Sequence, residues 1–298
     1  MTKSGSPYKV YTPYKNAWLK AVTPERTEQV PSEKLLHNLC QHPGTKVPTL
    51  AAMGFEESTI KVPKPALSAS TLQHYPDTRN FPAQDATSRL STYLRFGTFS
   101  VRQAVQLAQQ HSPVWLQELI WREFFMQLLW NFPASAQESF APKFRSIKWR
   151  NNEEEFRKWC EGKTGFPMVD AGMRQLNETG IMHNRVRMVV ASFLVKNLLI
   201  DWRWGEAYFA SKLLDYELSS NVGNWQWAAG TGADAQPYFR IFNPESQISK
   251  FDKDYAYIKK WLPEYGTPSY PAPMVAHAST RDRALATYKA AIAETEMS

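Results

Sequence analysis

Trp115, Glu118 and Arg122 are spaced at i, i+3 and i+7 in a segment with helical periodicity, so they share one face of a helix. An indole, a carboxylate and a guanidinium on one face could hold a flat, charged ligand. Glu118 and Arg122 can also pair at i, i+4, and such a pair is usually solvated. Here Trp115 and Trp121 flank it inside an otherwise apolar helix. Because partly buried charges need partners or a ligand, this helix is a candidate binding site.

A second candidate site is the run Thr87–Ser91, which opens a helical stretch after Pro82. Thr87 or Ser88 is a natural N-cap for a helix over Ser88–Phe96. Free N–H groups and the helix dipole favour phosphate at such an end, and the hydroxyls could complete a phosphate site. Capping alone explains these residues equally well, so both interpretations stay open.

Polar residues gather again where the segment Met182–Met188 begins a long helix that is expected to run to Leu199. Three of them share one face: Asn184, Arg187 and Met188. Arg185 is expected to point away from that face.

The segment Asp215–Trp227 is too polar and too rich in glycine to predict a helix, yet it contains Trp225 and Trp227. An ordinary surface loop rarely carries that combination. Beyond it lies a basic run that includes Arg240, Gln247 and Lys250. Such a run could follow a phosphate backbone or could form a solvated face.

Common cofactor and metal motifs are excluded. Gly162–Thr164 resembles the end of a phosphate-binding loop, but Arg157 stands where its first glycine is required, so a helix C-terminal turn is predicted. Gly230 and Gly232 lack the third glycine of a dinucleotide-binding turn. The six histidines show no HExxH spacing, and no metal site is expected.

The elements that position these residues belong to a chain of 298 residues, long enough to bury a large core. Its 35 basic and 28 acidic residues give a net charge of +7, and its 11 tryptophans can stack on flat ligands or bases as well as fill a core. Two cysteines without CxxC spacing indicate a reducing compartment, and we expect the cytoplasm, at the nucleoid. No apolar window is long enough to cross a membrane.

Prolines recur throughout residues 1–80 and predict an irregular segment that leads up to the core, with room for short helices only. From Thr87 onward, apolar residues recur at helical spacing, and no segment alternates as a strand does. We therefore predict an all-α fold and a single domain over residues 1–298. Residues 81–262 form its core, and residues 263–298 form a tail that ends in a helix over Thr280–Glu294.

Four stretches identify a resemblance: WLQELIWREFF, KWCEGKTGFPMVDAGMRQLNETGIMHNRVRM, LLIDWRWGEAYF and NVGNWQWAAGTGADAQPYFRIFNP. They resemble the helical FAD-binding domain of the photolyase and cryptochrome family, and PYKVYTPYKNAW at Pro7–Trp18 resembles the segment after that family's interdomain linker. The likeness runs through nearly the whole chain and is strongest to the class I members that repair cyclobutane pyrimidine dimers in DNA.

The resemblance implies that the chain binds a U-shaped FAD, active in its reduced anionic form. The implied cofactor residues are Tyr75, Thr87, Ser88, Arg89, Leu90, Ser91, Trp115, Glu118, Arg122, Asn184, Arg187, Asp215, Glu217 and Asn221. Asn221 corresponds to the residue that faces flavin N5, where an amide can accept the N5 hydrogen. Arg187 and Asp215 would form a buried ion pair that helps to keep the flavin anionic.

The implied partner is DNA that carries a pyrimidine dimer, and the activity is that of a carbon–carbon lyase in which excited reduced FAD gives an electron to the flipped dimer. The substrate and DNA residues are Arg79, Trp121, Asn184, Arg185, Met188, Trp227, Arg240, Gln247 and Lys250. Trp121 and Trp227 would stack on the dimer, while Glu118 and Asn184 bond its carbonyl edge. Trp225, Trp202 and Trp149 match the family's electron relay to the surface.

Several departures from the family pattern affect these expectations. The chain lacks the family's N-terminal α/β domain, so no antenna chromophore is expected. Glu217 stands where aspartate is usual, and the region after Pro263 is short. A monomer is expected. The alternatives are a cryptochrome-like photosensor, an enzyme for six-four photoproducts with His183 beside the cavity, and a damage-binding module that has lost repair.

Overall fold

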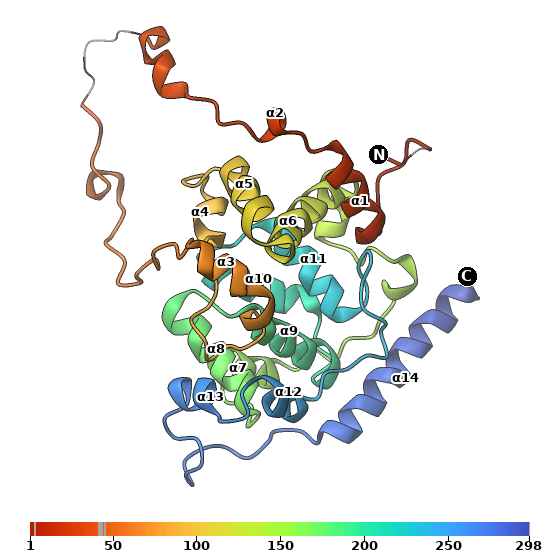
Figure 1. Ribbon diagram of the computed structural model, residues 1–298. Helices are drawn as coiled ribbons and strands as arrows, with labels where there is room; N and C mark the ends of the chain where they lie inside the picture. Colours follow the sequence, from red (N-terminus) through yellow and green to blue (C-terminus); the bar gives the residue numbers. More distant parts are fainter. Residues whose placement is uncertain (3, 41–43, 45, 298) are drawn as a thin grey trace.

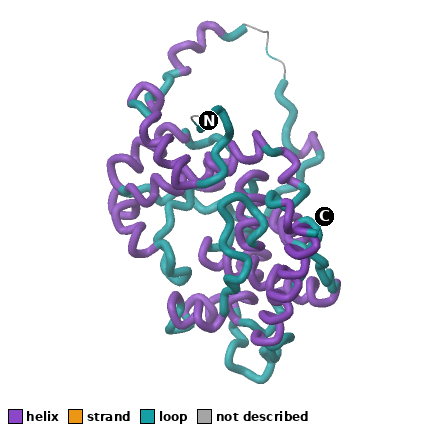
Figure 2. The backbone as a smooth tube through the Cα atoms, turned by 90° about the vertical axis from the view of Figure 1, so that its right-hand side faces the viewer, coloured by secondary structure: helices purple, strands orange, loops and turns teal. Residues whose placement is uncertain are grey.

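All regular structure in the described part of the chain is helical. The computed structural model describes residues 1–2, 4–40, 44 and 46–297. Helix accounts for 58% of the residues that the structure describes, and these residues contain no strand (Figures 1 and 2). The predicted all-α fold is therefore confirmed.

Fourteen α-helices, with five short 3₁₀ or π segments, follow one another along the described residues. The α-helices of the first half are α1 (Tyr11–Ala21), α2 (Pro24–Thr27), α3 (Ala69–Thr78), α4 (Ser91–Arg95), α5 (Val101–His111), α6 (Pro113–Asn131) and α7 (Glu153–Glu161). Those of the second half are α8 (Pro167–Thr179), α9 (Asn184–Ser192), α10 (Trp202–Lys212), α11 (Leu218–Ala229), α12 (Pro244–Phe251), α13 (Ala256–Trp261) and α14 (His277–Glu296).

Local signals explain where the site-bearing helices begin. Ser112 caps α6 by accepting the N–H of Trp115, and Pro113 takes the first helical position, where no N–H is needed. His183 caps α9 with its ring, which accepts the N–H of Arg185. Burial lowers the pKa of His183 to about 4, so the ring stays neutral and able to accept.

The long helix expected from Asn184 to Leu199 is interrupted. After α9 the chain forms a π-helical turn at Phe193–Asn197, in which every residue is buried. This wider turn places Lys196 in the core, where its ammonium group donates to the carbonyls of Ala229 (2.6 Å) and Tyr238 (3.0 Å). The periodicity predicted helix correctly but could not show the change of helix type.

The prediction that Asp215–Trp227 is not a helix was wrong, because α11 occupies most of that segment. Glu217 caps α11 by accepting the N–H groups of Ser219 and Ser220. Gly223 is needed because a Cβ there would lie 2.2 Å from a ring carbon of Phe125 on α6. Burial against α6, α9 and α10 outweighs the low helix propensity of this sequence.

The helices in the described part of residues 1–80 are short, as predicted: the longest are α1 with 11 residues and α3 with 10. The helices α1 and α3 both pack against α6, and Pro13 is tolerated because it lies in the first turn of α1. The described part of the chain between α2 and α3, residues 28–40, 44 and 46–68, extends away from the helical body (Figure 1). Its described residues include exposed apolar side chains such as Leu36, Leu39 and Phe55.

Two main apolar clusters make up the core. One joins α1, α3, α5 and α6, and the other joins α7 to α11 with α12 and α13. The tail helix α14 packs on a third, smaller cluster through Tyr288 and Ala291. Because α11 contacts both α6 and α9, it lies where the first cluster meets the second. The residues singled out from the sequence come from helices on both sides of this junction.

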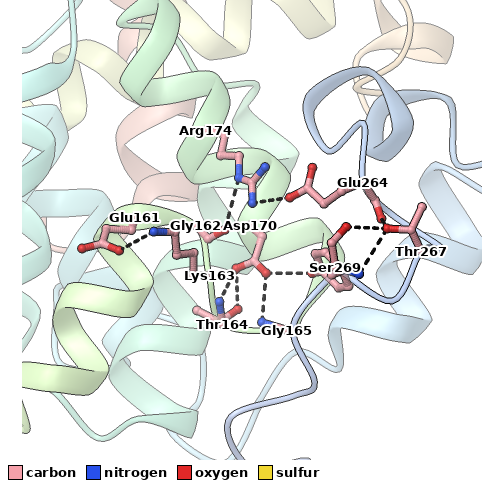
Figure 3. A network of polar contacts seen from close by, with 11 residues as sticks. Glu161, Gly162, Lys163, Thr164, Gly165, Asp170, Arg174, Glu264, Thr267 and Ser269 are labelled. Atoms are coloured by element: carbon pink, nitrogen blue, oxygen red, sulfur yellow. Dashed lines mark hydrogen bonds and ion pairs between the residues drawn. The ribbon is translucent and has the colours of Figure 1, made fainter.

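A polar network fastens the segment after α13 to the body (Figure 3). The carboxylate of Asp170 accepts the N–H groups of Thr164 (2.7 Å) and Gly165 (2.9 Å) and the hydroxyl of Tyr270 (2.7 Å). Gly162, with φ 63°, ends α7 just before this turn. The predicted helix C-terminal turn at Gly162–Thr164 is thereby confirmed.

Candidate functional site

A partly buried ion pair joins α9 to the turn before α11. Nη2 of Arg187 donates to Oδ2 of Asp215 at 3.0 Å and to Oδ1 at 3.2 Å, and Nε of Arg187 donates to the carbonyl of Met182. Burial alone would raise the pKa of Asp215, but the Arg187 charge and a hydrogen bond from Ser91 hold that pKa below its usual value. The predicted pair is confirmed, and its carboxyl group is ionised at neutral pH.

Glu118 pairs with a residue that the spacing did not suggest. Nη1 of Arg79, just after α3, lies 2.5 Å from Oε1 of Glu118, and the Arg79 guanidinium lies 5.6 Å from the ring centroid of Tyr75. Arg122 instead donates to the carbonyl of Leu94, so the i, i+4 pair with Glu118 is not formed. The reason is that α3 packs on α6 and brings a second guanidinium to the carboxylate.

The protonation of Glu118 reflects two opposing effects. Burial raises its pKa above the usual value, whereas the charge of Arg79 and its hydrogen bond act in the opposite direction. The net effect is a raised pKa for Glu118. Glu118 is therefore closer to a neutral, proton-donating state than an exposed glutamate is, although both members of the pair remain about one third exposed.

Asn221 is held in one orientation by Glu206, a residue that the sequence analysis did not single out. Nδ2 of Asn221 donates to Oε1 of Glu206 at 2.9 Å and to its backbone carbonyl at 3.1 Å. Asn221 itself is 8% exposed. In the described part of the chain no protein donor reaches its Oδ1, so the amide offers a free acceptor.

The run Thr87–Ser91 does not begin a helix at Thr87 or Ser88, and that prediction was wrong. Helix α4 starts at Ser91, and Leu90 stands at its N-cap without a side-chain hydrogen bond. Arg89 has φ 51°, a left-handed conformation that interrupts helical geometry. Thr87 and Ser88 therefore lie in the preceding turn, where Arg89 pairs with Asp85.

Glu217, which the resemblance assigned to the cofactor, has its carboxylate committed to its own helix. It accepts from the N–H groups and the hydroxyl groups of Ser219 and Ser220. Burial raises its pKa, but these hydrogen bonds outweigh burial and lower the pKa overall. The structure therefore assigns this side chain a capping role.

The three relay tryptophans differ in exposure. Trp202 is 0% and Trp225 is 2% exposed, whereas Trp149 is only partly buried. The ring neighbours of Trp225 are Phe209, at 5.0 Å between centroids, and Trp159, at 6.1 Å. Only Trp149 of the three reaches the surface, and no ring contact joins the three in the described part of the chain, so the relay stays a prediction.

The residues predicted for the dimer and for DNA vary in exposure. Asn184, Arg240 and Lys250 are exposed, while Trp121, Met188, Trp227 and Gln247 are partly buried. Arg185 donates to Oδ1 of Asn80 at 2.7 Å and lies 4.3 Å from the ring centroid of Phe251. This contact connects the start of α9 to α3 and α12, the helix that carries Gln247 and Lys250.

The sequence analysis missed two residues that contact the site. Glu206 orients Asn221, and Tyr11 stacks on Trp121 with 3.6 Å between ring centroids. Both lie inside stretches that carry the family resemblance, LLIDWRWGEAYF and PYKVYTPYKNAW, which was the only available signal. Their contacts span 15 and 110 positions, beyond any helical spacing.

The donors and acceptors gathered here fit the flavin that the resemblance implies. Oδ1 of Asn221 can accept an N–H, and the Arg187 guanidinium can balance negative charge on a ring. Trp115 and Leu90, 4% and 2% exposed, supply buried apolar surface. The described residues contain no helix that could span a membrane and no cluster of metal-ligating side chains.

Comparison with known proteins points to one family. A family model described as the FAD binding domain of DNA photolyase matches residues 115–290. The deoxyribodipyrimidine photo-lyase of Vibrio cholerae is 43% identical, over 97% of this chain and 70% of that protein. Its alignment runs over 331 positions, more than the 298 residues of this chain, so it holds internal segments with no counterpart here.

Solved structures agree with this result. The crystal structure of a bacterial class III photolyase from Agrobacterium tumefaciens superposes with a TM-score of 0.82 at 36% identity, covering 98% of this chain and 70% of that one. An archaeal photolyase from Sulfolobus tokodaii, solved with two FAD molecules, gives a TM-score of 0.75 at 34% identity, covering 97% and 69%.

Proposed function

Because the chain belongs to the DNA photolyase family and contains that family's FAD-binding domain, we propose that it repairs cyclobutane pyrimidine dimers in DNA in a light-dependent reaction. We further propose that residues 1–298 act as one domain, as a monomer, on DNA in the cytoplasm. We also propose that the chain is a class I member, on the sequence motifs quoted above.

The observation that supports this function most directly is the hydrogen bonding of Asn221. When bound, reduced FAD supplies the photoexcited electron that opens the cyclobutane ring. The chain's residues bind and orient it. Since Glu206 accepts from the amide nitrogen of Asn221 at two oxygens, Oδ1 is the atom that remains to accept a hydrogen bond, and an acceptor there would favour a flavin that carries hydrogen on N5. Arg187, held by Asp215, favours the anionic form.

The dimer would be recognised by stacking and by hydrogen bonds. Trp121 and Trp227 are assigned to stack on the flipped bases, and Met188 to pack against them. Glu118 and Asn184 are assigned to the carbonyl edge of the dimer. The raised pKa of Glu118 supports its part, because a protonated carboxyl group can donate to a carbonyl that gains negative charge.

Exposed basic side chains would bind the DNA phosphates, and the tryptophan relay would supply electrons to the flavin. Arg240 and Lys250 are exposed and can reach a phosphate backbone, while Arg79 and Arg185 are closer to the site. The buried Trp202 and Trp225 and the partly exposed Trp149 are assigned to reduce oxidised flavin from the surface. This relay restores the active form of the cofactor and takes no part in ring opening.

One experiment separates this function from its alternatives. The purified protein is loaded with FAD, reduced chemically, and mixed with an oligonucleotide that carries one thymine dimer. Repair under blue light but not in darkness supports the proposal. A photosensor or a binding module would leave the dimer intact in both conditions, and an enzyme for six-four photoproducts would repair only that lesion.

A further inference from the structure

The indole of Trp121 lies flat against the phenol ring of Tyr11. Their ring centroids are 3.6 Å apart, and the ring planes differ by 5°. Trp121 belongs to α6, and Tyr11 is the first residue of α1, which packs on α6. One face of the indole is therefore covered by another part of the chain.

Tyr11 is fixed in place by more than this stack. It is 6% exposed, its backbone N–H donates to Oδ2 of Asp234 at 3.0 Å, and its hydroxyl donates to the carbonyl of Gln117 at 3.0 Å. Gln117 precedes Trp121 by one helical turn, so the hydroxyl is anchored to the helix that carries the indole. Burial and the nearby Glu118 raise the pKa of Tyr11, which keeps the hydroxyl protonated as a donor.

A tryptophan that stacks on a flipped base needs a fixed ring plane, because any freedom of the ring must be lost on binding. Tyr11 covers one face of Trp121, and the ring of Phe124 meets the indole nearly at right angles, at 5.5 Å. These contacts restrain the indole before any ligand arrives.

We propose that Tyr11 is a positioning residue for damage recognition: its ring backs the indole of Trp121 and, with the rings of Phe124 and Phe125, fixes the plane in which that indole would stack on the flipped dimer. This inference rests on the proposed function, in which Trp121 stacks on the lesion. The other interpretation is that Tyr11 occupies the place of the lesion and is displaced by it. Burial and two satisfied hydrogen bonds argue against displacement.

The test measures dissociation constants in darkness for an oligonucleotide with one thymine dimer and for the same oligonucleotide undamaged, by fluorescence anisotropy. The variants are Tyr11→Leu, Tyr11→Phe and Trp121→Ala. The matched control is Tyr14→Leu, since Tyr14 is also on α1 but packs on Phe124, at 5.4 Å between ring centroids. FAD content and circular dichroism establish that each variant is folded.

Tyr11→Leu should lower the preference for damaged DNA by about threefold to tenfold, the range that one aromatic pair contributes. Affinity for undamaged DNA should not change, and neither should the single-turnover repair rate of reduced protein at saturating damaged DNA. Tyr11→Phe should stay within about twofold of wild type because the ring remains, although one hydrogen bond is lost. Tyr14→Leu should leave the preference unchanged.

Three results would overturn the inference: an unchanged preference in Tyr11→Leu, a stronger one, or an equal loss in Tyr14→Leu. A stronger preference would mean that Tyr11 blocks the lesion. If Trp121→Ala also leaves the preference unchanged, the role assigned to Trp121 in the proposed function fails with it. If Tyr11→Leu does not retain FAD, Tyr11→Met, whose unbranched side chain can adapt to the site but has no flat face, is held to the same outcomes.

Discussion

Removing Arg187 should destabilise the protein by about 3 kcal/mol at neutral pH, the lower end of the cost of breaking a buried ion pair. The Asp215 side chain is 9% exposed and that of Arg187 is 27% exposed. In Arg187→Met the Asp215 carboxylate would stay buried without its cation. We expect the lower end of the range because Arg187 is partly solvated.

The sign of the pH dependence follows from the pKa of Asp215. In the wild type that pKa is lowered, so the stability contributed by Asp215 is present above its unfolded pKa and is lost as pH falls through the folded pKa. In Arg187→Met the attraction of the guanidinium is gone and burial raises the pKa instead. Protonation then relieves the buried charge as pH falls. The stability difference between wild type and variant should therefore be largest near neutral pH and shrink in acid.

The measurement is urea unfolding followed by circular dichroism, at neutral and at mildly acidic pH and at equal FAD occupancy. A double-mutant cycle is made with Arg187→Met, Asp215→Asn and the double variant. The double variant should recover much of the lost stability because no unpaired charge remains. Arg157→Met is the control: its ion pair with Glu161 is exposed, and its loss should cost less than about 1 kcal/mol. The reasoning would be refuted if the loss of unfolding free energy in Arg187→Met did not depend on pH. It would also be refuted if the losses of the two single variants simply added in the double variant.

Three further predictions concern the cofactor, the relay and DNA. Glu206→Leu removes the side-chain acceptor of the Asn221 amide and keeps the backbone one, so reduced flavin should reoxidise in air about tenfold faster, since a bond to a charged group contributes about 1.5 kcal/mol; an unchanged rate in stopped-flow absorbance contradicts this. Trp149→Phe should slow photoreduction of oxidised flavin but not repair by pre-reduced protein, and equal losses of the two activities would indicate a structural role. Lys250→Ala should weaken binding of damaged and undamaged DNA alike and reduce the slope of log K against log salt by about 1, as measured by anisotropy titrations; a selective loss for damaged DNA would contradict a phosphate contact.

Local sequence patterns predicted much of the helical framework. The tail helix was predicted, although α14 begins three residues earlier than expected. The pattern failed at α11, because local propensity disfavours helix there while burial against neighbouring helices favours it. It failed at the start of α4 because a left-handed residue, Arg89, is not marked by any sequence signal.

The partners within the site could not be predicted from spacing. Arg79 pairs with Glu118 across 39 positions, and Glu206 binds Asn221 across 15. Such contacts depend on which helices pack together, and hydrophobic periodicity identifies only the apolar face of each helix, not its neighbour. The pair of Arg187 and Asp215 was anticipated, but only through the family resemblance.

The Arg79–Glu118 pair raises the question of whether two residues proposed to act on different parts of the substrate can also bind each other. Their side chains are 32% and 33% exposed, whereas the Asp215 side chain is 9% exposed. An ion pair whose side chains are each about one third exposed contributes at most about 1 kcal/mol to the free energy of unfolding. A DNA phosphate offers Arg79 an equally strong partner. Exchange of Glu118 for a phosphate is thus nearly neutral in free energy. Moving Arg79 to a phosphate would also remove the positive charge that opposes the effect of burial on Glu118. The pKa of Glu118 would then rise further, which favours its protonated, donating form when DNA is bound. The pair in the DNA-free protein is therefore compatible with the separate roles proposed for the two residues.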